Sequence, residues 1–101
     1  MGKIFSSGNW TVKPGHEDQF IEVFKTSNPA TTTQISGAPT PRLLRDLDHP
    51  GHYISFAEWP SEEALQEWRS RPELPHLLDS FREHLDEMAI LTLQEVPLEY
   101  S

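Results

Sequence analysis

The chain has 101 residues, no cysteine and a formal net charge of -8. The lack of cysteine excludes disulfides, thiolate metal sites and a cysteine nucleophile. The negative charge argues against a nucleic-acid partner, because proteins that track phosphate backbones carry an excess of basic residues. No apolar run approaches the roughly 20 residues that cross a bilayer, and residues 1–10 lack a secretory pattern. We therefore expect a cytoplasmic protein that does not contact a membrane.

The length predicts one domain that covers residues 1–101. Folding of such a chain hides only roughly 65% of the surface that the unfolded chain exposes, so a monomer would be marginally stable. Because no disulfide stabilises the fold, we expect association with a partner subunit to stabilise it.

The first part of the chain predicts a strand followed by a helix. Apolar residues alternate with small polar ones over Ile4–Lys13, and a Pro-Gly turn then ends the strand. From His16 the apolar residues fall at helical spacing, and two acidic residues occupy the expected first turn. The polar segment Ser27–Pro41, rich in threonine and proline, is expected to form a long loop.

The second part predicts a hairpin, two helices and a last strand. The runs Arg42–Leu47 and Tyr53–Trp59 are separated by a turn cluster, which is typical of a hairpin. Ser61 is placed to cap a helix that ends near residue 70, and apolar residues within 74–85 recur at helical steps. The alternating run Met88–Val96 predicts the final strand.

The resulting order, β-α-β-β-α-β, is that of the ferredoxin-like α+β fold, in which helices cover one face of a four-stranded antiparallel sheet. The other face of the sheet then needs a second layer that shields its apolar residues from water. Both faces of the predicted strands carry apolar residues, with Phe5 opposite Trp10 and with Leu91 and Leu93 opposite Ile90. We expect a homodimer through the open sheet face, with Phe5, Leu91 and Leu93, or the opposite strand faces, at the contact.

The chain resembles the antibiotic biosynthesis monooxygenase family over nearly the whole length of the chain, and three stretches carry the resemblance. They are Val12–Phe20, the pair Arg42–Asp46 and Tyr53–Phe56, and Glu58–Leu65. The last is the most specific, since this family commonly closes its third strand with a tryptophan and opens the next helix with a Ser-x-x-Ala segment. The resemblance implies a dimeric α+β barrel with a hydrophobic pocket in each subunit, and often the oxidation of a phenol or quinol without a cofactor.

The resemblance also implies site residues. In the family's aromatic polyketide monooxygenases, an asparagine and the strand-closing tryptophan lie on strand three, and a tyrosine lies on helix two. Trp59 matches the tryptophan, whereas Ser55 stands at the asparagine position and Leu65 at the tyrosine position. A cofactor-free oxidation needs a buried polar group to hold the substrate anion, and Ser55 is a smaller donor for that task than asparagine.

The family's heme-degrading branch supplies an alternative. It uses an asparagine on strand one, a tryptophan late in helix two and a histidine that ligates iron, for which the candidates here are Asn9, Trp68 and His76. His76 lies two residues nearer the tryptophan than in that branch, and Asn9 is one position off register. Heme is therefore the alternative ligand, with a non-catalytic ligand-binding module as a further possibility.

We expect a cofactor-independent monooxygenase that acts on a quinol or a polycyclic or phenolic aromatic. The expected catalytic residues are Trp59, Ser55 and Asn9. The expected substrate-binding residues are Tyr53, Phe56, Trp68, His76, Trp10 and Phe24. The competing interpretation of the three tryptophans is that they only pack in the core of a small domain.

No metal or nucleotide site is expected. His49 and His52 flank a Pro-Gly turn beside Asp46 and Asp48, a pattern more typical of a solvated turn than of metal ligands. The chain also lacks a glycine-rich phosphate loop.

Overall fold

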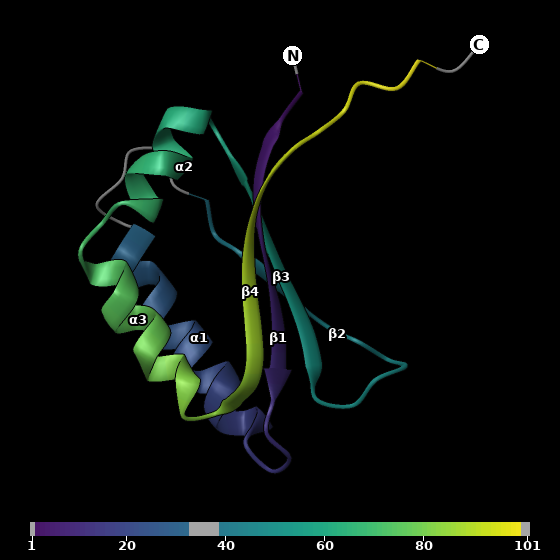
Figure 1. Ribbon diagram of the computed structural model, residues 1–101, viewed down its shortest axis with the longest axis vertical. Coiled ribbons are helices and arrows are strands. Elements are labelled where there is room, and N and C mark those ends of the chain that lie inside the picture. Colours follow the sequence, from purple (N-terminus) through teal and green to yellow (C-terminus); the bar gives the residue numbers. More distant parts are fainter. Residues whose placement is uncertain (1, 33–38, 100–101) are drawn as a thin grey trace.

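The computed structural model describes residues 2–32 and 39–99. It contains a four-stranded antiparallel sheet with all the described helices on one face (Figure 1). The strands are β1 (Ile4–Val12), β2 (Arg42–Arg45), β3 (His52–Trp59) and β4 (Leu85–Gln94), in the spatial order β2-β3-β1-β4. The helices are α1 (Glu17–Thr32), α2 (Glu62–Arg69) and α3 (Glu73–Arg82). The ferredoxin-like α+β class predicted from the sequence is confirmed.

The main difference from prediction concerns α1. The polar segment that begins at Ser27 was expected to be loop, but the helix continues through it to Thr32. Helix propensity is a weak preference that the rest of a fold can override, and here the helix includes even Pro29, which cannot donate a backbone hydrogen bond. The remainder of the predicted loop falls partly in residues 33–38, which lie outside the described residues.

The last strand begins earlier than predicted, at Leu85 instead of Met88. The pairing of β1 with β4 shifts between Thr11 and Val12, so that Val12 pairs with Leu85. Such a shift disrupts the regular alternation of side chains along the strand, which is why the alternation in the sequence starts only at Met88.

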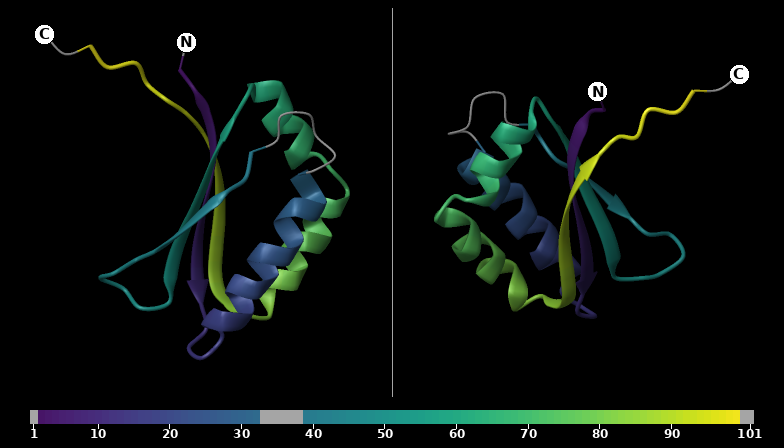
Figure 2. Two further views of the ribbon diagram at one scale, coloured as in Figure 1. Left: turned by 180° about the vertical axis from the view of Figure 1, so that it is seen from behind. Right: turned by 45° about the horizontal axis from the view of Figure 1, so that its top comes forward.

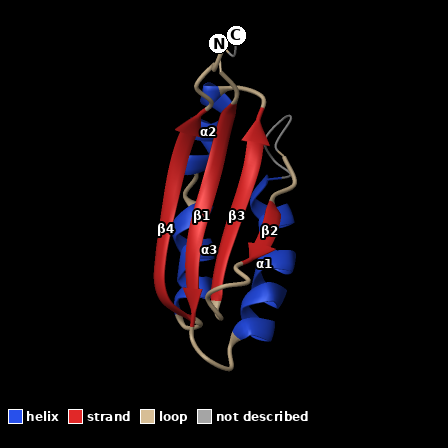
Figure 3. Cartoon of the chain, turned by 90° about the vertical axis from the view of Figure 1, so that its right-hand side faces the viewer, coloured by secondary structure: helices blue, strands red, loops and turns tan. Residues whose placement is uncertain are grey.

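One face of the sheet packs against the helices, which lie behind it in Figure 3. Strand alternation directs Ser6, Gly8, Trp10 and Val12 of β1 toward the helices, and all four are buried. The apolar core between the two layers comprises Trp10, Val12, Phe20, Tyr53, Trp59, Leu65, Trp68, Leu74, Leu77, Phe81 and Leu85.

The opposite face carries no helix in the described part of the chain (Figure 3). Apolar side chains nevertheless meet there across neighbouring strands. Phe5 pairs with Leu93, and Ser7 stands between Leu91 and Phe56. Leu91 is 44% exposed and Leu93 is 45% exposed, so this face has a partly exposed apolar surface, as the alternation predicted.

Local contacts fix the helices over the sheet. The Ser61 hydroxyl accepts a hydrogen bond from the Ala64 amide at 3.1 Å, which confirms the predicted cap of α2. The turn before α1 and the turn after α3 lie at the same end of the sheet (Figure 2). There the Nδ1 atoms of His16 and His84 lie 3.1 Å apart and connect the two turns. Within the described residues, no helix is both long and apolar enough to span a bilayer.

Candidate functional site

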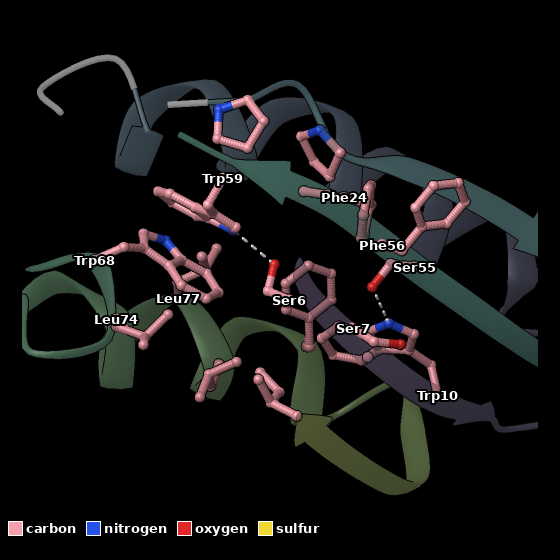
Figure 4. Close-up of a pocket in the computed structure, with 17 residues that line it drawn as sticks. Ser6, Ser7, Trp10, Phe24, Ser55, Phe56, Trp59, Trp68, Leu74 and Leu77 are labelled. Atoms are coloured by element: carbon pink, nitrogen blue, oxygen red, sulfur yellow. Dashed lines mark hydrogen bonds between the residues drawn. The ribbon is translucent and has the colours of Figure 1, made fainter. Parts of the chain in front are cut away.

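A pocket lies between the helix-facing side of the sheet and the three helices (Figure 4). Its floor comes from β1 and β3, and one wall comes from Leu74, Leu77, Leu78 and Phe81 of α3. The space between atoms is about 550 Å³, open solvent included. The described residues that line it include no ionisable side chain. The pocket is therefore suited to a flat, apolar group.

The floor is built from a short motif that occurs twice. Both strands carry a serine, then a small residue two positions later, then a tryptophan two positions after that. The motif is Ser6, Gly8 and Trp10 on β1, and Ser55, Ala57 and Trp59 on β3. Because the strands are antiparallel, with Ser6 opposite Ala57 and Gly8 opposite Ser55, the two copies are related by a local two-fold axis.

Each tryptophan donates a hydrogen bond to the serine of the other strand. The Trp10 Nε1 atom lies 2.9 Å from Ser55 Oγ, and the Trp59 Nε1 atom lies 2.9 Å from Ser6 Oγ (Figure 4). Ser6 and Ser55 are only 8% and 7% exposed. A hydroxyl can both accept and donate, and neither serine has another hydrogen-bond partner in the described structure. Each hydroxyl therefore keeps a proton that it can donate to a ligand.

The small residue of the first copy is required by this packing. A Cβ atom at Gly8 would lie 2.6 Å from Trp10 Nε1 and 2.7 Å from Ser55 Oγ. Both distances are shorter than a nonbonded carbon contact permits, so any larger residue would displace the Trp10 ring from its hydrogen bond.

The third tryptophan provides an unpaired donor. Trp68 of α2 packs on Trp59, with ring centroids 5.5 Å apart and ring planes at 33°. Trp68 is only 8% exposed, and its Nε1 atom is buried without a hydrogen-bond partner in the part of the chain that the structure describes. An unsatisfied buried donor costs about 1–3 kcal/mol, so such groups are uncommon unless a ligand or water satisfies them. Trp68 thus marks a position where an acceptor atom of a ligand can bind.

Comparison with protein families gives a match to the antibiotic biosynthesis monooxygenase model over residues 4–80. The chain belongs to the antibiotic biosynthesis monooxygenase family. This confirms the resemblance drawn from the sequence motifs. A comparison with curated protein sequences gives no match.

Solved structures of the same fold support the assignment. SnoaB from Streptomyces nogalater, a cofactor-independent oxygenase, is 21% identical, with a TM-score of 0.72 over 98% of this chain and 100% of SnoaB. A structure from Bordetella bronchiseptica, titled with the name of the same family, is 19% identical, with a TM-score of 0.78 over 96% of this chain and all of that one. A conserved protein from Methanosarcina mazei is 22% identical, with a TM-score of 0.78 over 95% of both chains. At these sequence identities, the comparison with solved structures shows a shared fold only.

The pocket of this family member brings together six of the residues singled out from the sequence, namely Trp10, Phe24, Ser55, Phe56, Trp59 and Trp68. Phe56 borders the pocket although strand alternation directs its side chain to the open face of the sheet. Ser6 was missed, because its serine and glycine neighbours give no sign of burial. The repeated Ser-x-small-x-Trp spacing was the signal that could have found it.

Asn9 does not reach the pocket, contrary to the role expected for it. Odd-numbered residues of β1 point to the open face, where Asn9 Oδ1 lies 3.2 Å from His52 Nε2. Tyr53 also lies outside the pocket. Its ring is 3% exposed and packs against Phe20, and its hydroxyl accepts a hydrogen bond from Arg45 Nε at 3.4 Å. Tyr53 is a core residue beside the pocket.

His76 is exposed on α3 and does not line the pocket, so the heme template fails at its ligand. The buried side of α3 is formed by Leu74, Leu77 and Phe81, and His76 faces away from it. Heme iron in proteins is held by histidine, cysteine, methionine or tyrosine, and the described lining has none of these. The residues of this pocket do not fit a heme.

The turn between β2 and β3 forms a hydrogen-bonded cluster around one carboxylate. Asp46 Oδ2 lies 2.7 Å from His52 Nδ1 and 3.0 Å from His49 Nδ1, and Asp46 Oδ1 accepts from the amide of Asp48 at 2.9 Å. The hydrogen bond from His52, followed by that from Asp48, holds the pKa of Asp46 well below its usual range. Among the residues that the structure describes, no group of three or more potential ligands is placed to hold a metal ion.

Proposed function

We propose that this chain is a cofactor-independent monooxygenase that oxidises a quinol or another phenolic aromatic in the pocket between sheet and helices. The observation that carries the proposal is the set of hydrogen-bond donors in an apolar pocket: the indole N–H of Trp68 and the hydroxyls of Ser6 and Ser55. Membership of the monooxygenase family supports it, as does the shared fold of SnoaB, a cofactor-independent oxygenase.

The proposed reaction begins with the loss of a phenolic proton from the bound substrate. The described lining contains no ionisable base, so the proton leaves to solvent through the open mouth. Fixed donors in a water-poor site stabilise the resulting anion more strongly than water does. The electron-rich anion then reduces O₂. One oxygen atom bonds to a ring carbon in place of hydrogen, the other leaves as water with two hydrogens from the substrate, and the substrate, which has supplied all four electrons, leaves as a quinone.

Each pocket residue has a role in this scheme. Trp59 and Trp68 form an aromatic wall against which a flat substrate packs, since aromatic groups favour tilted and offset contacts. Ser55 stands where related enzymes carry an asparagine, and its hydroxyl donates to the substrate oxygen while it accepts from Trp10. Trp68 donates to a second oxygen, which favours substrates with two oxygen atoms on one ring system.

We also propose that residues 1–101 form one domain, which acts in the cytoplasm as a homodimer. The partner is a second copy of the chain, packed on the open face of the sheet. Phe5, Leu91 and Leu93 supply a continuous apolar surface there, with two of these residues more than two-fifths exposed. Partly exposed apolar patches of this kind mark interaction sites in small domains.

The proposal is tested by oxygen consumption. Metal-depleted protein is mixed with a panel of hydroquinones, naphthohydroquinones and anthrones, and O₂ uptake is compared with the uncatalysed rate. We expect catalysed uptake with at least one substrate and a reduced rate in Trp59→Phe, with Leu47→Ala, an exposed turn residue, as the control. Uptake at the background rate across the whole panel would reject the assignment.

A further inference from the structure

A second groove adjoins the pocket on the outer side of α3. It lies between α3, the link from α2 to α3, and β4, which is an edge strand of the sheet. The space between atoms is about 1040 Å³, open solvent included. Leu74, Leu78 and Ile90 line both this groove and the aromatic pocket, so the two cavities lie next to each other at these side chains.

The groove differs from the pocket in its charge. Arg69, Arg71 and Arg82 line it, and these are three of the eight basic residues in a chain of net charge -8. The described residues that line the groove include no acidic side chain. A local concentration of positive charge on an acidic protein attracts an anion and not a second cation or a neutral group.

The arginines are available to bind such an anion. Arg69 makes no ion pair or hydrogen bond with its side chain in the described structure. Arg82 Nε lies 3.4 Å from Asp79 Oδ1, but both side chains are about two-thirds exposed, at 66% and 68%. Exposed pairs of this kind contribute little free energy, so a ligand anion can replace Asp79 at small cost. Arg71 Nη2 lies 3.5 Å from Glu67 Oε1, and this ion pair holds Arg71 beside Arg69 and Arg82.

We propose that the substrate carries a carboxylate, which Arg69 and Arg82 bind in this groove while its aromatic ring lies in the adjoining pocket. The guanidinium fork matches a planar carboxylate through two parallel hydrogen bonds. This inference rests on the proposed function, because it is the proposed function that places the aromatic ring in the pocket. It narrows the substrate class from phenolic aromatics to aromatic acids.

A binding experiment tests this without turnover. A naphthoquinone carboxylate and its neutral methyl ester have the same ring system, and neither can be oxidised as a quinol. Their affinities are measured by the quenching of tryptophan fluorescence, since three tryptophans border the pocket. We expect the carboxylate to bind about tenfold more tightly than the ester, and added salt to reduce the difference.

Variants assign the preference to the groove. In Arg69→Gln and in Arg82→Gln the carboxylate should lose several-fold in affinity, while the ester should bind as in the wild type. Lys25→Gln, which removes the same charge from an exposed position on α1, should retain the full preference. Both arginines are exposed, so the variants should fold normally, which circular dichroism verifies.

The outcomes separate this inference from the proposed function. Equal affinities for the carboxylate and the ester, or a preference that survives in both arginine variants, would overturn the inference even if quinols are oxidised. An arginine-dependent preference in a protein that consumes no O₂ would support a carboxylate-binding site in the groove and reject the monooxygenase assignment.

Discussion

The indole nitrogen of Trp59 donates a hydrogen bond of 2.9 Å to the hydroxyl of Ser6, a residue 53 positions earlier on the neighbouring strand, and both side chains are buried. The same bond is repeated between Trp10 and Ser55. These two crossed bonds hold two large rings at fixed positions on the floor of the pocket. The shape of the site therefore depends on two serine hydroxyls.

Replacing one of these serines should leave a buried indole donor without a partner. We expect Ser6→Ala to lower the free energy of unfolding by about 1–3 kcal/mol, measured by chemical denaturation. Ser7→Ala, on the opposite face of β1, serves as the control and should have a smaller effect. Equal stability of Ser6→Ala and the wild type would show that the bond does not stabilise the fold.

Replacing Trp68 should separate ligand binding from stability. The Trp68 donor has no partner among the described residues, so Trp68→Phe removes an unsatisfied group and keeps most of the aromatic packing. We expect a change of less than about 1 kcal/mol in the free energy of unfolding, and a loss of about tenfold in quinone affinity. Unchanged affinity, measured by quenching of the remaining tryptophans, would exclude Trp68 as a ligand donor.

Much of this arrangement could be predicted from the sequence, because it follows from periodicity. The alternation on β1 placed Phe5 and Trp10 on opposite faces, and the cap at Ser61 fixed the start of α2. Trp59 and Trp68 both border the pocket, and Trp59 lies within the family motif Glu58–Leu65. These features depend on local contacts, on the two-residue alternation of a strand, or on the spacing of three to four residues along a helix.

The remaining features depend on contacts between distant segments. Asn9 was aligned by resemblance, but one step of strand register moves a side chain to the opposite face. His76 was chosen by resemblance, although the helical spacing of Leu74, Leu77 and Phe81 already places it on the other side of α3. The pairing of Ser6 with Trp59 arises from the register of β1 with β3, which no local pattern specifies.

Asp46 should make the stability of the hairpin depend on pH in the acid range. Its pKa is lowered in the folded state, chiefly by the hydrogen bond from His52, so the unfolded chain binds the proton more readily. The stabilisation is complete above the usual carboxyl range of about pH 4 and is lost as the pH falls through the lower folded-state pKa. Asp46→Asn removes this contribution.

The measurement is thermal unfolding of wild type and Asp46→Asn across the acid range. The wild type should be more stable at neutral pH, and its advantage should shrink steadily below about pH 4. Asp48→Asn is the matched control, because the Asp48 carboxylate accepts no hydrogen bond in the described structure. An advantage that does not change with pH would contradict the assignment.

The homodimer proposal predicts a mutation-sensitive interface. A charge placed in the apolar face of the sheet should prevent a second copy from covering it, because a buried unpaired charge is costly. We expect Leu91→Asp to halve the mass measured by light scattering, whereas Val96→Asp, an exposed residue beyond the end of β4, should not. A wild-type protein that is monomeric at micromolar concentration would refute the interface.

In the function that we propose, the pocket oxidises an aromatic substrate with O₂ and no cofactor. The most direct test is a reaction of metal-depleted, flavin-free protein under isotopically labelled O₂, with the product analysed by mass spectrometry. We expect one labelled oxygen atom in the product, formed faster than in buffer and more slowly in Trp59→Phe. A product without the label, or a reaction that proceeds only when a metal or flavin is added, would contradict it.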